Sequence, residues 1–225
     1  GHSKVVKILL AVDGIQVNQA TNRGTTPLSV ACQEDHFKIV EMLLAVGDIQ
    51  VNQAGNYECS LLYKAWQSGR WKVVEMLLAV GGIQINQANN NERLQVLLLL
   101  HDACQEGHSK IVEMLLAVDG IQVNQADDGG VTPLGIACRG GHLKVVELVL
   151  AMNGVQVNQA DEHGFTSLYR ACHNGHFKVV EMLLGVDGIQ VNLAGNHGVT
   201  ALFTSCASGR LKVVNLLLAV NGIRV

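Results

Sequence analysis

The heptapeptide GIQVNQA at residues 14–20 returns, with small changes, five more times along the chain. The later copies occupy residues 48–54, 82–88, 120–126, 154–160 and 188–194. Their central hydrophobic residues are Val17, Val51, Ile85, Val123, Val157 and Val191, so the steps between copies are 34, 34, 38, 34 and 34 residues. A single active site needs its residues once, whereas a fixed period of this length is typical of stacked repeats.

The residues between two copies predict a pair of short helices. In one unit, Thr132 can accept hydrogen bonds from the first backbone N–H groups of a helix, and Pro133 follows at the first helical position. Gly141 then interrupts the chain before the strongly apolar segment 144–150. Such a segment cannot be exposed on all sides, so each helix pair needs its neighbours to cover it.

The period and the segments TPLxxAC, GHxKVVEMLL and VN resemble the ankyrin repeat over essentially the whole chain. The resemblance implies an all-α solenoid of stacked helix-turn-helix units joined by β-turn or hairpin loops. The unit here is 34 residues long rather than about 33. The histidine of the family's TPLH segment is also replaced, by Ser29, Tyr63, Gly135, Tyr169 and Phe203.

We expect one array over residues 1–225, which begins and ends inside repeats and is therefore a segment of a longer array or a larger protein. Residues 1–20 form a partial repeat and 195–225 the last one, and the full repeats are 21–54, 55–88, 89–126, 127–160 and 161–194. Unit 89–126 lacks the Thr-Pro cap and has four additional residues, close to one helical turn. We predict a longer first helix from near Glu92. The unit is then either a drifted repeat that has absorbed the insertion, or a repeat whose protruding helix a partner recognises.

Composition disfavours two classes of partner. The net charge of −3 and the pI near 6.3 provide no general attraction to nucleic acid or to an anionic membrane. No apolar run approaches the roughly 18 residues that a membrane-spanning helix needs. Because no secretory signal stands at the N-terminus, we expect an intracellular, cytoplasmic protein.

Most cysteines and histidines recur at equivalent positions of the repeat, which indicates a structural role rather than a reactive or metal-binding site. Cysteine occupies the same place in five units, at Cys32, Cys104, Cys138, Cys172 and Cys206. Stacked helices lie roughly 8–10 Å apart, beyond the ~7 Å limit for a disulfide, so we expect buried free thiols. Cys59 stands in a predicted turn, so for this cysteine an exposed, reactive thiol is the alternative to a buried one. Arg70 and Arg210 replace the histidine that starts the other second helices, and arginine is not a zinc ligand.

No catalytic or nucleotide-binding motif is present, so we expect no enzyme, no cofactor and no metal site. The asparagine of each heptapeptide is expected to brace its turn by bonding to nearby backbone. The resemblance implies hydroxylation by asparaginyl hydroxylases as an alternative role, but Gln replaces an acidic residue two positions before each asparagine.

Residues that vary between units are the candidate binding residues. In ankyrin-like proteins the turn tips and the exposed sides of the first helices line a concave groove that binds other proteins. Matching positions implies the following residues: Asn22, Arg23, Thr25, Gln33, Glu34, Asn56, Tyr57, Tyr63, Gln67, Asp128, Val131, Arg139, Glu162, His163, Phe165, Tyr169, His173, Asn174 and His197. Tyr57 and Phe165 are aromatic tip residues, a type that often dominates binding energy, whereas we expect Trp66 and Trp71 to serve in packing.

The expected function is a non-enzymatic scaffold that binds a partner protein on the concave surface. Two alternatives stay open at this point. The chain could be a self-associating structural array whose exposed end helices stack head to tail. It could also be the targeting arm of an enzyme or channel whose other domains are missing from this sequence.

Overall fold

A computed structural model describes residues 1–52, 61–80, 90–118 and 120–224. These residues form two compact units, 1–95 and 96–225, which are considered separately below. The predicted tips at Asn56 and Tyr57, and Cys59, lie outside the described residues.

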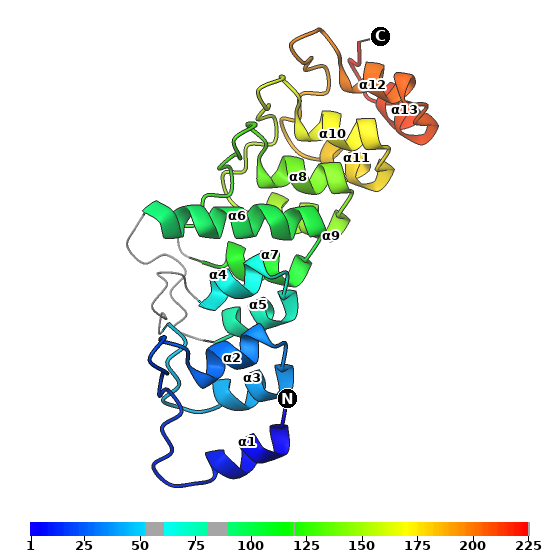
Figure 1. The fold of residues 1–225 in the computed structure, drawn as a ribbon. Helices are drawn as coiled ribbons and strands as arrows, with labels where there is room; N and C mark the ends of the chain where they lie inside the picture. Colours follow the sequence, from blue (N-terminus) through cyan, green and yellow to red (C-terminus); the bar gives the residue numbers. More distant parts are fainter. Residues whose placement is uncertain (53–60, 81–89, 119, 225) are drawn as a thin grey trace. The chain divides into compact units, whose positions relative to one another are not determined.

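Both units are built from short helices that pack in pairs (Figure 1). The first unit contains α1 (Ser3–Leu10), α2 (Pro27–Gln33), α3 (Phe37–Leu44), α4 (Leu61–Gln67) and α5 (Trp71–Leu78). The second contains α7 (Ser109–Leu116), α8 (Pro133–Gly140), α9 (Leu143–Leu150), α10 (Ser167–Asn174), α11 (Phe177–Leu184), α12 (Ala201–Ala207) and α13 (Leu211–Leu218). The described residues contain no strand beyond one isolated antiparallel bridge, between Ala194 and Thr200. The all-α prediction is therefore confirmed.

Within each unit, first helices pack on first helices and second helices on second helices. In the second unit, α8, α10 and α12 form one row and α7, α9, α11 and α13 form the other. In the first unit, α2 packs on α4, and α3 packs on both α1 and α5. The side chains buried between the helices are mainly aliphatic. In α9, for example, Val145, Val146 and Val149 are almost completely buried.

Threonine caps start the first helices, as the sequence predicts. The Thr132 hydroxyl accepts a hydrogen bond from the Gly135 N–H at 3.2 Å, and Thr26 does the same for Ser29. Thr166 and Thr200 make equivalent bonds without a following proline. Threonine is therefore the common starting signal, because its side chain bonds an N–H that has no partner within the helix.

The helix α6 (Asn90–Glu106) has 17 residues, compared with seven or eight for α2, α8, α10 and α12. The predicted longer first helix is thus confirmed, although it begins two residues before Glu92. Its last turns bury Leu99, Leu100, Ala103 and Cys104, which is the apolar face that the shorter first helices also bury.

Four of the five aligned cysteines are buried free thiols, as predicted: Cys32, Cys104, Cys138 and Cys172. Burial raises the pKa of Cys32, Cys104 and Cys172 to about 12, so these thiols stay protonated at neutral pH. The prediction was wrong for Cys206, which is exposed. Cys206 lies on α12, which with α13 forms the last helix pair of the described residues.

Candidate functional site

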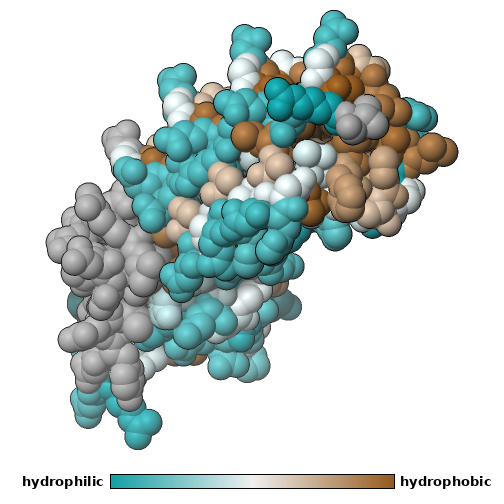
Figure 2. Space-filling view, turned by 90° about the horizontal axis from the view of Figure 1, so that it is seen from above, coloured by the Kyte–Doolittle hydropathy of each residue, from teal (hydrophilic) through white to brown (hydrophobic). Residues whose placement is uncertain are grey.

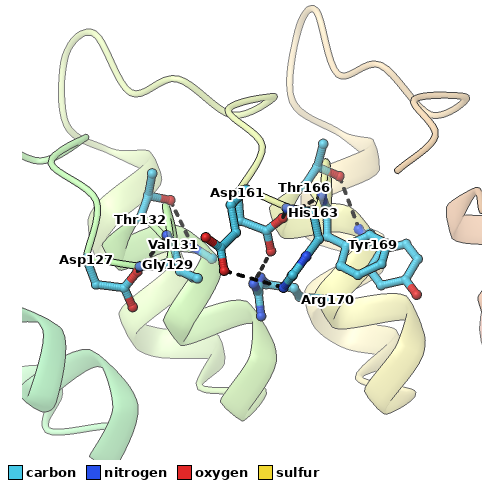
Figure 3. A network of polar contacts seen from close by, with 12 residues as sticks. Asp127, Gly129, Val131, Thr132, Asp161, His163, Thr166, Tyr169 and Arg170 are labelled. Atoms are coloured by element: carbon cyan, nitrogen blue, oxygen red, sulfur yellow. Dashed lines mark hydrogen bonds and ion pairs between the residues drawn. The ribbon is translucent and has the colours of Figure 1, made fainter. Parts of the chain in front are cut away.

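Two aspartates shape the turn tips of the second unit (Figure 3). Asp161 Oδ1 accepts hydrogen bonds from the backbone N–H groups of His163 and Phe165, each at 2.8 Å. Asp127 Oδ1 binds Gly129 and Val131 in the same way, at 3.0 and 2.8 Å. An aspartate side chain that folds back on its own turn fixes the backbone there, so both tips have a defined shape.

Neighbouring tips are joined through their backbones. The Glu162 N–H donates to the Gly129 carbonyl at 3.3 Å, and the Asn196 N–H donates to the His163 carbonyl at 2.9 Å. Gly164 has a φ of 79°, and a Cβ there would lie 2.9 Å from the Gly195 Cα. Only glycine combines this left-handed backbone with so close an approach, and the three tips 127–131, 161–165 and 195–199 therefore form one surface.

A buried ion pair ties the central tip to its helix. The Arg170 guanidinium of α10 donates to Asp161 Oδ2, and the two side chains are 15% and 1% exposed (Figure 3). Because Asp161 also shapes the tip, this pair sets the position of the tip relative to α10. Buried pairs of this kind are costly to break, since the remaining charge loses its partner.

Three rings form a row along one side of α10. The Phe165 ring lies flat on the Tyr169 ring, with centroids 3.9 Å apart and an interplanar angle of 4°. The His173 ring follows nearly parallel to Tyr169, at 6.2 Å. We call Phe165, Tyr169 and His173 the ring row. The four-residue spacing places Tyr169 and His173 on one face of α10, whereas Phe165 precedes that helix in the tip.

Both ends of the ring row are held by the next repeat. A Cβ on Gly195 would lie 2.5 Å from Phe165 Cε1, so the ring rests directly on the backbone of the next tip. At the other end, His173 Nδ1 lies 2.9 Å from the hydroxyl of Thr204, a residue of α12 that is buried. The ring row is therefore fixed before any partner binds.

The comparison with protein families agrees with this architecture. A family model described as ankyrin repeats (3 copies) matches residues 1–89, 100–194 and 150–225. The chain belongs to the ankyrin-repeat family. The matches omit only residues 90–99, which are the first ten residues of α6. None of the curated proteins matches the chain.

Most of the predicted site residues of this ankyrin-repeat chain reach the surface. The exposed ones are Asn22, Arg23, Gln33, Glu34, Gln67, Asp128, Arg139, Glu162, His163, His173 and His197. The half-buried ones are Thr25, Tyr63, Phe165, Tyr169 and Asn174. The structure brings together the residues of the central tip and α10: Glu162, His163, Phe165, Tyr169 and His173.

Val131 differs from the expectation, because its side chain is buried, with 8% of its surface exposed. It occupies the place of Phe165 in the preceding repeat, but the residue four positions later is Gly135 rather than Tyr169. A Cβ on Gly135 would lie 3.1 Å from Val131 Cγ1, so valine fills space that the glycine leaves open. Val131 therefore belongs to the packing of its tip.

The two tryptophans of the first unit are half-buried. The Tyr63 ring packs edge-on against Trp66, with centroids 5.3 Å apart. Trp71 opens α5. Both positions are compatible with the predicted packing role.

His101 is a residue that sequence reasoning missed. Its side chain is 5% exposed, and its Nε2 lies 3.0 Å from the carbonyl oxygen of Gln125. Burial lowers its pKa, although the bond to Gln125 and the charges of Asp127 and Asp102 oppose this effect. Removing the four-residue insertion from the alignment places His101 opposite Gly135, at the histidine position of TPLH, and this signal could have identified it.

The histidines that begin the second helices have the structural role predicted for them. His142 Nε2 lies 2.8 Å from the carbonyl oxygen of Gln105, in the first helix of the preceding repeat. Arg210 Nε donates to the equivalent carbonyl of His173 at 3.0 Å. Arginine can replace histidine here because the position needs only a hydrogen-bond donor to a helix end.

No three His, Cys, Asp or Glu side chains gather into a possible metal site within the part of the chain that the structure describes. Across the same described ranges, every helix is too short or too polar to cross a bilayer.

Proposed function

We propose that this chain is a non-enzymatic scaffold that binds a partner protein on the tips 127–131, 161–165 and 195–199 and on the adjoining side of α8 and α10. Ankyrin repeats are in general protein–protein interaction modules. In the first unit, considered by itself, the predicted residues such as Arg23 and Glu34 are further candidates for contact with a partner.

The single observation that supports this proposal most is the fixed ring row. Phe165 and Tyr169 are already stacked and held by Gly195, so they lose little side-chain freedom when a partner binds. Rigid aromatic side chains of this kind frequently supply most of the energy of an interface.

Site-specific photocrosslinking tests the proposal. A photoreactive amino acid is placed at Glu162, beside the ring row, or at Lys178 on α11 as a matched exposed control. In native lysate we expect a discrete crosslinked protein from position 162 and none from 178. The Phe165→Ala/Tyr169→Ala variant should abolish that crosslink. Equal crosslinking from both positions, or none from 162, would contradict the proposal.

A second candidate function is self-association, and the exposed apolar side chains of the first and last helices favour it. Ile8 of α1 is 69% exposed, and Phe203 and Leu211 of α12 and α13 are 61% and 71% exposed. Figure 2 shows hydrophobic side chains gathered at the end of the second unit where α12 and α13 lie. Light scattering over a concentration series tests this candidate: growth in mass that Leu211→Lys prevents would support stacking, and a constant monomer mass would rule it out.

A further inference from the structure

Two of the three tips of the second unit carry negative charge, and the third, 195–199, contains no carboxylate. Residues 127–131, 161–165 and 195–199 contain four carboxylates and no lysine or arginine. Arg170 balances Asp161 from within the fold, whereas Asp127, Asp128 and Glu162 are exposed. The surface that these tips form is therefore negative on its outer side.

The nearby basic residue does not balance this charge. Arg139 lies in the last turn of α8, at the opposite end of that helix from its tip, and donates to Gln105 Oε1 at 3.2 Å. The tip of the first unit at 21–25 has the opposite character, since it carries Arg23 and no carboxylate. Negative charge on the tip is thus not common to every repeat.

The negative tips are continuous with the ring row. Glu162 Oε1 lies 3.5 Å from His163 Nε2, and both side chains are more than half exposed, at 61% and 66%. The His163 ring lies 6.0 Å from that of Phe165, which is stacked on Tyr169. One tip thus holds an exposed carboxylate, Glu162, next to the aromatic side chains.

We infer that the partner presents an arginine-bearing segment to this surface, with its guanidinium group between the Asp128 and Glu162 carboxylates and the rings. This inference rests on the proposed function, because it specifies the partner of the same face. A planar guanidinium can bond a carboxylate through its fork of N–H donors and lie against an aromatic ring as well. Cations gain energy within about 6 Å of a ring centroid, so one arginine can use both features.

Selection from a random 12-residue peptide library on the immobilised wild-type chain tests the inference. The enriched peptides are then measured against three variants with unchanged circular dichroism and melting temperature. Asp128→Asn/Glu162→Gln removes the tip carboxylates, and Phe165→Ala/Tyr169→Ala removes the rings. Glu147→Gln/Glu181→Gln removes the same charge from exposed carboxylates on α9 and α11, which pair with Lys144 and Lys178.

We expect the enriched peptides to share an arginine. Their affinity should fall about tenfold or more in the tip variant and the ring variant, and stay within about twofold in the control. Replacing the shared arginine by citrulline should cause a similar loss. Peptides without a basic residue that still depend on the rings would overturn this inference and leave the proposed function standing. Peptides that bind the tip variant and the ring variant as tightly as the wild type, or a selection that enriches no peptide, would overturn the inference and the proposed function together. An equal loss of affinity in the control variant would show that only net charge matters, and would overturn the inference alone.

Discussion

Asn158 holds the backbone of the repeat that follows its own: its side-chain amide donates to the Gly188 carbonyl at 2.8 Å, thirty residues later. Its Oδ1 accepts the N–H of Gln190 at 2.9 Å. Asn18, Asn124 and Asn192 bond the same two positions of the repeat that follows each of them. The recurring asparagine therefore braces a turn, as predicted, but that turn belongs to the neighbouring unit.

Replacing Asn158 by alanine removes both hydrogen bonds that its side chain makes to the next repeat. We expect the free energy of unfolding to fall by about 1–2 kcal/mol, since each bond contributes roughly 0.5–1.5 kcal/mol. Urea denaturation measures the change. Gln190→Ala is the matched control, because it keeps the backbone N–H that Asn158 binds, and its stability should match the wild type. A fully stable Asn158→Ala variant would mean that these bonds contribute nothing to stability.

The Asp161–Arg170 pair predicts a strong coupling between two substitutions. Asp161→Asn keeps the oxygen that shapes the tip but leaves the Arg170 charge buried without a partner, which should cost about 3 kcal/mol. Arg170→Met in the Asp161→Asn background should restore part of this loss, because the unpaired charge is gone. A double-mutant cycle in urea measures the coupling. Additive losses would show that the pair contributes no interaction energy.

Gly195→Ala should displace the ring row without removing a ring. The added methyl would meet Phe165 Cε1 at 2.5 Å, and overpacking of this kind costs about 1–3 kcal/mol. Phe165→Ala removes the group that clashes, so Gly195→Ala should cost less in that background. Thermal unfolding of the four combinations checks this expectation. Near-ultraviolet circular dichroism reports the aromatic environment directly, and an unchanged spectrum in Gly195→Ala would contradict it.

His101 predicts a loss of stability in mild acid. Its folded-state pKa lies below the ordinary value near 6.5, so the unfolded chain takes up the proton more readily. Its contribution is complete above about pH 6.5 and falls as the pH drops towards the folded-state pKa, by at most about 1.4 kcal/mol per pH unit. His101→Gln keeps a donor for the Gln125 carbonyl but does not titrate.

The wild type should therefore lose more free energy of unfolding than His101→Gln between pH 7.5 and 5.5, as measured in urea at both pH values. The other histidines are common to both proteins and cancel in the comparison. Identical losses in the two proteins would show that His101 is not responsible.

Much of the fold could be predicted from the sequence because the same pattern recurs in several units. The 34-residue step follows from comparing the units. The threonine caps and the apolar second helices depend on local chemistry, which can be recognised within single units. The longer helix α6 was predictable for the same reason, since four residues add about one turn without rotating the buried face.

The candidate site was less predictable, because equivalent positions do not have equivalent surroundings. Val131 and Phe165 occupy the same place in their repeats, yet one packs onto a glycine and is buried while the other stacks on Tyr169. Cys206 shares its position with buried cysteines but is itself exposed.

The sequence alone determined the family, the helical class and the positions of the turns, because these follow from periodicity and from bonds within a few residues. Only the tertiary structure showed that Asn158 bonds the next repeat, that Arg170 reaches Asp161, and that Gly195 supports Phe165. The physical reason is that burial and hydrogen bonding depend on which side chains of two neighbouring units meet, and a pattern read within one unit does not contain that pairing.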